Sequence, residues 1–453
     1  MSSPNVVIIF ADDLGYGDLG CYGSTVNRTP RFDQMADQGM RFTDFYVASP
    51  VCSPSRAALM TGCYPKRVGL DSGHDFCVLL PGDPIGLDSG TFSLPRMFSN
   101  AGYSTKIVGK WHLGDQPEFL PTRHGFDSYF GLPYSNDMLP GHPDSNRFHF
   151  PPLPLMRDEK VTETDPNQAS LTDRYTAEAV RFIEENAKNK TPFFLYLAHM
   201  YVHLPIHTPM RYTIASKNGV YGAAVAHMDQ STGVILDTLK RLGIDENTLL
   251  IFTSDNGSNG LDGGSNAPLR GTKGTTWEGG MREPCIMRWP NHIPAAAVCS
   301  EITTTMDLLP TLAGLVNGVI PADHVLDGKD ILALMQGDVN ARSPYEAFFY
   351  YGKGDHTLHA VRSGKWKLHL LLNELYDLEA DITEQHNVFA DHPDIVAQLT
   401  TLADACRREL GDAHTDIEGT GCQPVGRVEN PITLTSVNQM DPIIRAMYDL
   451  DDC

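Results

Sequence analysis

The stretch NVVIIFADD, residues 5–13, decides the fold class of this 453-residue chain. Residues 6–10 are all apolar, without the alternation of a half-exposed strand, and this is typical of a strand covered on both faces. Such strands belong to parallel sheets that are flanked by helices. Two acidic residues, Asp12 and Asp13, follow directly at the carboxyl end of the predicted strand.

The following two-thirds of the chain repeat this pattern. Further strand-like apolar segments lie at 103–110, 192–199, 247–257 and 284–290. Helical patterns alternate with them at 29–39, 171–189, 221–243 and 303–316. This alternation predicts an α/β fold with a mostly parallel central sheet and helices on both faces.

The pattern changes near residue 343. Short strand patterns with tight connections follow at 346–352, 358–364, 365–371 and 374–379, and one helix pattern covers 392–410. We therefore predict two domains: an α/β domain over residues 1–342, and a smaller α+β subdomain over 343–453 with an antiparallel sheet and an irregular tail. The segment 131–173, rich in Pro, Asp and Asn, is too long for a plain connection and is expected to be a functional loop.

The composition excludes some function classes. With 56 acidic and 35 basic residues, the net charge is −21, whereas nucleic-acid binders carry a basic surplus or stripe. No segment is long and apolar enough to span a membrane. Met1 runs almost directly into the first strand without a signal peptide, so two interpretations stay open. The protein is cytoplasmic, or it is exported (periplasmic or secreted) and its numbering starts after the removed signal.

The cysteines carry no metal signature. Nine are present, and none forms a CxxC pair or a zinc-type spacing. Free, buried thiols are therefore favoured over disulfides, although some cysteines could pair in an exported protein.

Polar side chains collect where the predicted strands end, which is where open α/β sheets bind ligands. Asp12 and Asp13 follow the first strand, and Asp255 and Asn256 follow the strand at 247–254. These four residues offer only oxygen donors. That donor set suits a hard cation such as Ca²⁺ or Mg²⁺ rather than Zn²⁺.

Histidines follow another strand. His199, His203 and His207 have the spacing of a helical zinc patch, but Pro205 and Pro209 would break such a helix. We therefore expect His203 to act alone, as a hydrogen-bond donor or an acid.

The segment VCSPSRAALMTG, residues 51–62, predicts a short helix with Ser53 as its N-cap, Pro54 at its first helical position and Gly62 at its left-handed end. Arg56 lies one turn after Cys52 and would point back toward it. One interpretation is a reactive side chain at a helix N-terminus beside a fixed cation, an arrangement that binds anions. The alternative is a surface helix beside a buried cysteine. The glycine-rich segment 269–284 adds Lys273, a mobile positive charge for an oxyanion.

Several segments together resemble one family, the type I sulfatases. CSPSRAALMTG, residues 52–62, resembles the family signature, whose first cysteine is enzymatically oxidised to formylglycine. Other segments are similar to the family's segments in the same order: ADDLGYGDLGCYG, GKWHLG, SDNGSNG, LRGTKGTTWEGGMREP and DLLPTLAGL. FLPTRHGFDSYFGLPYSND looks like the arylsulfatase A branch. The likeness covers residues 5–378 and implies an alkaline-phosphatase-like fold.

The resemblance also implies roles for the matching residues. The hydrate of formylglycine at Cys52, made by a formylglycine-generating enzyme, would be the nucleophile. One Ca²⁺ would be bound by Asp12, Asp13, Cys52, Asp255 and Asn256. The side chains around the sulfate would be Arg56, Lys110, His112, Ser135, His203 and Lys273. Among them, Arg56 would hold the formylglycine, and His203 would lie near the leaving-group oxygen.

The implied activity is sulfuric ester hydrolysis, on a sulfated carbohydrate or an aryl sulfate, through a covalent sulfo-enzyme intermediate. The expected partners are a sulfated small molecule or saccharide and the maturation enzyme, with neither nucleic acid nor membrane. Specificity is expected in residues 69–88, in 131–173 and in the C-terminal domain. Two alternatives remain open: a formylglycine-dependent phosphonate monoester or phosphodiester hydrolase, and a non-catalytic, metal-stabilised binding protein.

Overall fold

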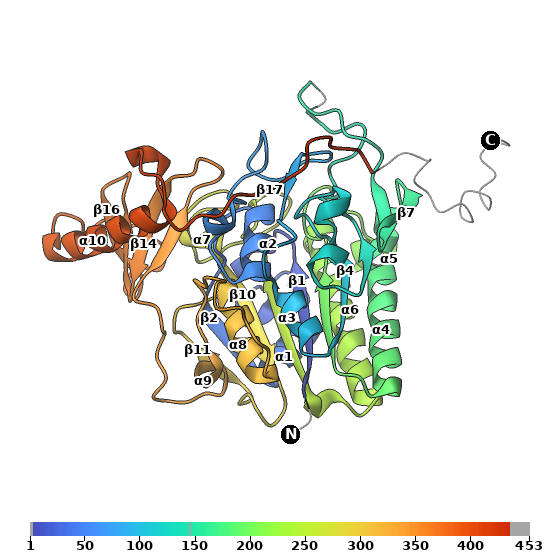
Figure 1. Ribbon diagram of the computed structural model, residues 1–453. Coiled ribbons are helices and arrows are strands. Elements are labelled where there is room, and N and C mark those ends of the chain that lie inside the picture. The colour runs from blue at the N-terminus through green and yellow to red at the C-terminus, as the bar shows by residue number, and fades with distance from the viewer. Residues whose placement is uncertain (1–2, 145, 435–453) are drawn as a thin grey trace.

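Figure 1 shows the computed structural model of the chain, which describes residues 3–144 and 146–434. Its centre is a large twisted sheet whose strands follow the order β11-β2-β10-β9-β1-β8-β4-β5-β6-β7, with β12 beside β2. In chain order these strands are β1 (Asn5–Ala11), β2 (Met40–Tyr46), β4 (Ser104–Gly109), β5 (Ser128–Gly131), β6 (Pro154–Arg157), β7 (Lys160–Thr164), β8 (Phe193–Ala198), β9 (Thr248–Ser254), β10 (Arg282–Arg288), β11 (Ala297–Cys299) and β12 (Thr303–Thr304).

The middle of the sheet is parallel, as the apolar runs predicted. β1 pairs in parallel with both β8 and β9, and β4 pairs in parallel with β8 and β5. The antiparallel pairs involve β10, which lies between β9 and β2, and the edge strands β6 and β7. The mostly parallel α/β fold is therefore confirmed.

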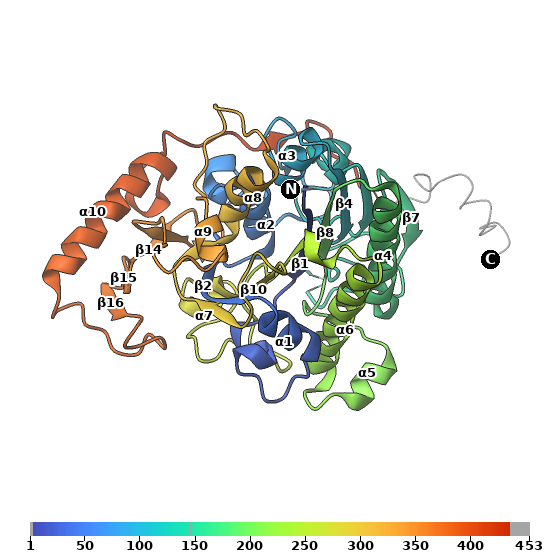
Figure 2. The same ribbon diagram turned by 90° about the horizontal axis from the view of Figure 1, so that it is seen from below.

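Helices cover both faces of the sheet. Figure 2 shows α2 (Cys52–Thr61), α3 (Leu94–Asn100) and α8 (Leu308–Val316) on one side, with α1 (Pro30–Asp37), α4 (Leu171–Asn189) and α6 (Gly219–Arg241) on the other. Alternate side chains of β1 enter the two cores. Val6 and Ile8 join the cluster that includes α2 and α8, while Val7 and Ile9 join the cluster that includes α1, α4 and α6. Burial on both faces is the reason that this strand is apolar at every position.

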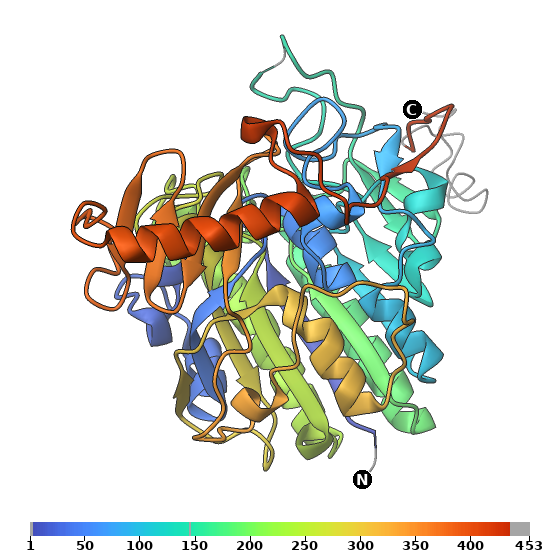
Figure 3. The same cartoon turned by 60° about the vertical axis from the view of Figure 1, so that its left-hand side comes forward.

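The smaller C-terminal unit is an antiparallel sheet of four strands with one long helix. The strands are β13 (Phe348–Tyr351), β14 (Leu358–Ser363), β15 (Trp366–His369) and β16 (Glu374–Asp377), and α10 (Pro393–Leu410) lies across them (Figure 3). Leu399 and Ala403 of α10 pack in one cluster with Val361 and Leu368 of the sheet. The predicted α+β unit is confirmed, whereas the boundary between 342 and 343 stays a prediction.

The last described residues return to the α/β domain. β17 (Gly426–Arg427) pairs with β3 (Ile85–Gly86), and Gln116 exchanges two hydrogen bonds with the backbone of Ile432, at 2.7 and 2.8 Å. This part of the predicted irregular tail therefore packs on the larger unit. Short helices complete the described structure: α5 (Met210–Ala215), α7 (Glu278–Met281) and α9 (Leu332–Met335).

Membrane-spanning helices, disulfides and the long loop can now be compared with the predictions in the described part of the chain. Every helix in it is too short or too polar to cross a bilayer. The eight cysteines in it carry free thiols, and Cys453 lies outside the described residues. The expected functional loop at 131–173 contains the hairpin of β6 and β7, so part of it is regular structure.

Candidate active site

The predicted site residues meet at the carboxyl ends of the central strands. Asp12 and Asp13 follow β1, Asp255 follows β9 and Lys110 follows β4, and all four side chains are buried. Because β4, β8, β1 and β9 are parallel neighbours, these ends lie at one edge of the sheet. Cys52 is the first residue of α2 and faces the same place.

The start of α2 differs from the prediction in one detail. Val51 is the N-cap residue and makes no side-chain capping bond, whereas the Oγ of Ser53 accepts a hydrogen bond of 3.1 Å from the backbone N–H of Leu79. The predicted Ser53 cap is therefore wrong, because Cys52 itself occupies the first helical position. The predicted left-handed end at Gly62 is confirmed by its φ of 67°. All ten residues of α2 are buried, so the surface-helix alternative is also wrong.

Four side chains form a cluster that suits a cation. Ligand atoms of Asp12, Asp13, Cys52 and Asp255 all lie within 4.8 Å of one another. Asn256 adds a further oxygen: its Nδ2 donates to Oδ1 of Asp13 at 2.7 Å, while its own buried Oδ1 has no protein partner. A buried, unpartnered amide oxygen beside three carboxylates fits a hard divalent cation.

Each carboxylate of this cluster also contacts a basic side chain. Lys110 Nζ lies 2.6 Å from Asp12, Arg56 Nη2 lies 2.8 Å from Asp255, and Lys273 Nζ lies 2.7 Å from Asp13. Burial alone would raise the pKa of Asp12, but Lys110 and Arg56 outweigh it and hold that pKa well below its usual value. Burial, and then the neighbouring Asp12, raise the pKa of Asp255 to about 6. An acidic protein thus concentrates three cations in one buried pocket.

The thiol of Cys52 lies between a negatively charged and a positively charged side chain. Its Sγ is 3.4 Å from Oδ1 of Asp12 and 3.4 Å from Nζ of Lys273. Burial and then Asp255 raise the pKa of this thiol well above its usual value, although Lys110 and Lys273 act in the opposite direction. An unmodified thiol here is protonated at neutral pH and is a weak nucleophile.

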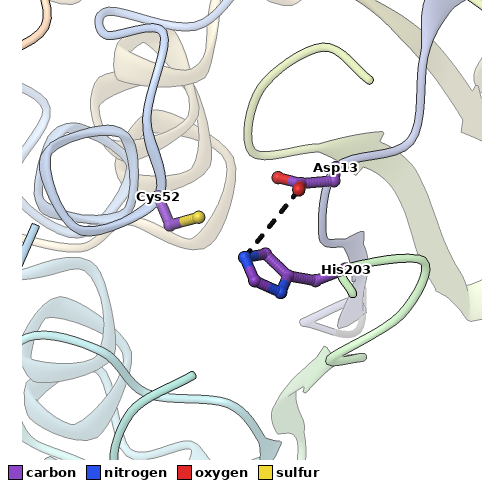
Figure 4. A group of neighbouring side chains, drawn as sticks. All are labelled: Asp13, Cys52 and His203. Atoms are coloured by element: carbon purple, nitrogen blue, oxygen red, sulfur yellow. Dashed lines mark ion pairs between the residues drawn. The ribbon is translucent and has the colours of Figure 1, made fainter. Parts of the chain in front are cut away.

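His203 is the predicted histidine that reaches the cluster. Its Nε2 lies 3.8 Å from Oδ2 of Asp13, on the side that faces Cys52 (Figure 4). His199 points elsewhere, with its Nε2 3.5 Å from the Oγ of Ser231. Within residues 3–144 and 146–434, the only histidine in a metal-type cluster is His203, so the zinc patch with His207 is not formed.

His112 is buried with one free ring nitrogen. Its Nε2 lies 2.9 Å from the carbonyl of Leu79, and its Nδ1 has no partner. Burial and then Lys110 hold the pKa of His112 well below its usual value. The ring is therefore neutral, and with Nε2–H donating to Leu79, Nδ1 is left as an acceptor. Ser135 lies nearby, and its Oγ accepts a hydrogen bond of 3.3 Å from Lys110.

Two of the predicted site residues have unusual backbones. Asp13 and His112 both adopt a φ of 62°, the left-handed region that residues other than glycine seldom enter. The backbone N–H of His112 donates to the carbonyl of Pro133 at 3.0 Å, and that of Asp13 donates to Oδ1 of Asp255 at 3.1 Å. Strain of this kind persists where the surroundings hold it, and it collects at functional sites.

Comparison with known proteins agrees with this geometry. The family model described as Sulfatase matches residues 4–319. The chain belongs to the sulfatase family. A second model, described as N-sulphoglucosamine sulphohydrolase, C-terminal, matches residues 272–409 of this sulfatase.

Curated relatives and a solved structure agree with the family. N-acetylgalactosamine-6-sulfatase of Rattus norvegicus is 41% identical over 381 residues, which cover 81% of this chain and 71% of the relative. Arylsulfatase A of Homo sapiens is 40% identical over 388 residues, covering 81% and 74%. The crystal structure of Ps i-CgsB in complex with k-i-k-neocarrahexaose aligns with a TM-score of 0.80 at 31% identity, covering 89% of this chain and 92% of that chain. The predicted family and the alkaline-phosphatase-like fold are confirmed, and the chain is an enzyme of the sulfuric ester hydrolase class.

The loop that carries Lys273 in this sulfatase is anchored on the C-terminal subdomain, and nothing in the sequence indicated this. On one side of the loop, Arg270 Nη1 donates to the carbonyl of Glu384 at 2.6 Å. On the other side, the N–H of Glu278 donates to the carboxylate of Glu384 at 2.8 Å, and the carboxylate of Glu278 accepts from Lys367 at 2.9 Å. Glu278, Lys367 and Glu384 are completely buried. The subdomain therefore holds Lys273 in place from both sides.

Replacing Lys367 by methionine is expected to destabilise the protein by about 3 kcal/mol or more, because it leaves Glu278 and Glu384 buried with one fewer cation. Since these groups anchor the loop, kcat for sulfate release should fall as well. Chemical denaturation and steady-state kinetics measure the two effects. The control is Lys365→Met, in the turn between β14 and β15, where the lysine is partly exposed and pairs with Asp377. Equal behaviour of both variants would contradict the anchoring role.

A cavity of about 580 Å³ opens beside the cluster. Asp13, His203 and Lys273 form its inner wall. Its other lining residues are Asp137, Leu139, Gly141, His142, Pro143, Leu204, Pro205 and Asn259. Most of these come from the segments 137–143 and 203–205. Part of the segment 131–173 therefore lines the cavity, and its role in specificity stays a prediction.

Proposed function

We propose that this sulfatase removes sulfate from a sulfated carbohydrate, with formylglycine made from Cys52 as its nucleophile and one Ca²⁺ as its metal. One observation carries the proposal: Sγ of Cys52 lies 3.4 Å from both the Asp12 carboxylate and the Lys273 ammonium group. A reacting group at that position would have metal-type ligands on one side and a cation for the sulfate on the other. Asp12, Asp13, Asp255 and Asn256 would hold the metal, which supplies positive charge beside the sulfate oxygens.

The basic side chains of the pocket would bind the anionic part of the substrate. A sulfate ester carries its negative charge on the non-bridging oxygens, and charge develops on the ester oxygen as it departs. Lys110 and Lys273 already point into the cluster, and Ser135 holds the Lys110 ammonium group with a hydrogen bond. Preorganised cations in a buried pocket stabilise such charge without the cost of reorganisation.

Two histidines would move the protons. His203 lines the cavity and lies at the mouth of the cluster, where a leaving ester oxygen would take up a proton. His112 is buried, and its free Nδ1 would accept the proton of the second hydroxyl of the formylglycine hydrate. Loss of that proton re-forms the aldehyde and releases sulfate. A serine at position 52 has one hydroxyl and lacks this route.

Replacing His112 by alanine is expected to lower kcat for sulfate release by about 10²–10⁴-fold, the usual contribution of a positioned base. The first equivalent of alcohol should still appear as a burst, because the base acts after the ester bond is cleaved. Since the pKa of His112 is held well below its usual value, sulfate release should not lose this base between pH 7.5 and pH 6.

Stopped-flow measurement of alcohol release, combined with ion chromatography of sulfate, separates the two steps. Alcohol and sulfate slowing by the same factor, without a burst, would contradict this role of His112. The matched control is His124→Ala, which removes another completely buried histidine outside the cluster.

The cavity supports a sugar as the leaving group. A volume of about 580 Å³ lies within the range of sites for small ligands, and its walls combine apolar residues with Asp137, His142 and Asn259. The named activities of the relatives, N-acetylgalactosamine-6-sulfatase among them, favour a sulfate ester over a phosphonate. We propose that the sulfated sugar is taken at a chain end.

Sulfate release by ion chromatography tests this function. Protein co-expressed with a formylglycine-generating enzyme is incubated with defined sulfated mono- and oligosaccharides, an aryl sulfate and an aryl phosphonate. Release from a saccharide supports the proposal. Turnover of the phosphonate alone, with Cys52 shown by mass spectrometry to be converted, would overturn it.

A further inference from the structure

Three surface segments meet at the entrance of the cavity. The ring of Phe148 lies 5.2 Å from that of His142, a cavity residue, and 5.6 Å from that of Phe76. On the other side, Gly354 packs on the same segment: a Cβ atom placed on it would lie 2.9 Å from Cα of Cys77. Residues 76–77, 142–144, 146–150 and 352–357 therefore form one continuous rim, to which the C-terminal subdomain contributes.

Two exposed cations lie on this rim. The guanidinium carbon of Arg147 lies 4.9 Å from the centre of the Phe76 ring and 5.1 Å from that of Phe148, so the arginine is held on an aromatic surface. Lys353 lies over the glycine-rich loop: a Cβ atom on Gly274 would be 2.9 Å from its Cδ and 3.4 Å from its Nζ. Gly274 directly follows Lys273, so this rim charge is close to the sulfate pocket.

Cations near the rim all act electrostatically on the thiol of Cys77. Burial raises the pKa of the Cys77 thiol, and Lys353, Lys273 and Arg147 all act in the opposite direction. Three cations from three separate segments thus lie near one point of the rim.

Neither rim cation forms an ion pair with another described residue. In the part of the chain that the structure describes, no carboxylate lies within 4.0 Å of the Arg147 guanidinium or of the Lys353 ammonium group. The nearby carboxylates Asp75, Asp137 and Asp355 each face a histidine instead. Two accessible cations at the entrance to an anion pocket are available to an anionic ligand.

We propose that Arg147 and Lys353 form a binding site for a second anionic group, a carboxylate or a sulfate, on the sugar next to the one whose ester is cleaved. The substrate would then be a glycan with charged neighbouring sugars rather than an isolated sulfated sugar. This inference rests on the proposed function, since the scissile sulfate fixes where the neighbouring sugar lies. Arg147 can bind such a group through two parallel N–H donors, and Lys353 adds a point charge.

Binding is measured without turnover, in the Cys52→Ala background, by calorimetry. The probes are three disaccharides that share a sulfated N-acetylgalactosamine and differ in the neighbour, which is neutral, carries a carboxylate or carries a sulfate. The test variant is Arg147→Gln with Lys353→Gln. The control is Lys365→Gln, which removes a lysine of the same subdomain that pairs with Asp377 at 2.6 Å.

The double variant is expected to bind the two charged-neighbour disaccharides about tenfold more weakly at low salt, with the neutral-neighbour disaccharide unchanged. The difference should shrink as salt is added, since exposed charges are screened. A response to only one anionic probe identifies which group the site takes. Equal effects on all three probes, an effect as large in the control, or no binding of the charged probes by the parent would overturn the inference. Aryl sulfate turnover by the wild-type enzyme tests the proposed function separately.

Discussion

Replacing Cys52 by alanine is expected to lower kcat/KM for every sulfate ester by about 10⁴-fold or more, while the protein stays folded. The side chain is the proposed nucleophile, and the remaining cations can only bind the ester. The fold should survive, because the ion pairs of Asp12 with Lys110, and of Asp255 with Arg56, do not involve the thiol. Sulfate release measures the first effect, and thermal unfolding measures the second.

Replacing Cys52 by serine tests separately whether the enzyme can accept sulfate and whether it can release it again. Cys52→Ser keeps one hydroxyl in the pocket but offers no second hydroxyl to expel sulfate. We expect at most one sulfate to be transferred per active site, with a mass increase that corresponds to a sulfate ester on the protein. Sustained turnover by Cys52→Ser would contradict the formylglycine mechanism. Cys63→Ala, at another buried free cysteine, is the matched control for loss of a thiol.

Local sequence pattern was sufficient to predict the frame of the site. Asp12 and Asp255 directly follow buried strands, and strand ends in a parallel sheet lie together, so the carboxylate cluster could be expected before its geometry was known. The same rule placed Lys110 after β4. The family resemblance then added Ser135 and the roles of the individual residues.

Contacts between distant segments could not be predicted. Glu278 and Lys367 are 89 positions apart, and Lys367 lies in the stretch KWKLHLL, which is an ordinary pattern for a half-exposed strand. In the structure both side chains are completely buried against each other. In the sequence, the two residues of a buried ion pair look like two exposed charged residues. The periodicity of a strand does not reveal which other segment covers each of its faces.

The predicted N-cap of α2, Ser53, was wrong for a related reason. Ser53 is a good capping residue by type, but its hydroxyl accepts from Leu79, a residue of a distant loop, and the helix begins one residue earlier. The left-handed backbone of His112 was also not predictable. Histidine enters the left-handed region more often than most residues, but this preference is too weak to indicate one position in a sequence. The hydrogen bond to Pro133 that holds His112 there comes from another segment.

The second large effect expected is loss of activity when divalent cations are removed. Three carboxylates lie in one buried cluster, and the pKa of Asp255, raised to about 6 by burial and by Asp12, reflects how closely they crowd. A bound Ca²⁺ would relieve that crowding, and it would do so only in the folded state. At a Ca²⁺ concentration of about 100 times Kd, it would stabilise the fold by about 2.7 kcal/mol.

Chelation should therefore abolish sulfate release and lower the melting temperature, and Ca²⁺ should restore both. Asp255→Asn and Asn256→Ala are expected to lose the thermal shift with Ca²⁺, because each removes a proposed ligand oxygen or its charge. Asp245→Asn keeps the shift, since that carboxylate pairs with Arg288 at 2.8 Å, outside the cluster. If Mg²⁺ but not Ca²⁺ restored sulfate release and the melting temperature, the proposed site would stand and its metal would be Mg²⁺. An enzyme that stays fully active after chelation, with no bound metal by elemental analysis, would remove the metal from the proposal, leaving Arg56, Lys110 and Lys273 as the sole balance for the three carboxylates.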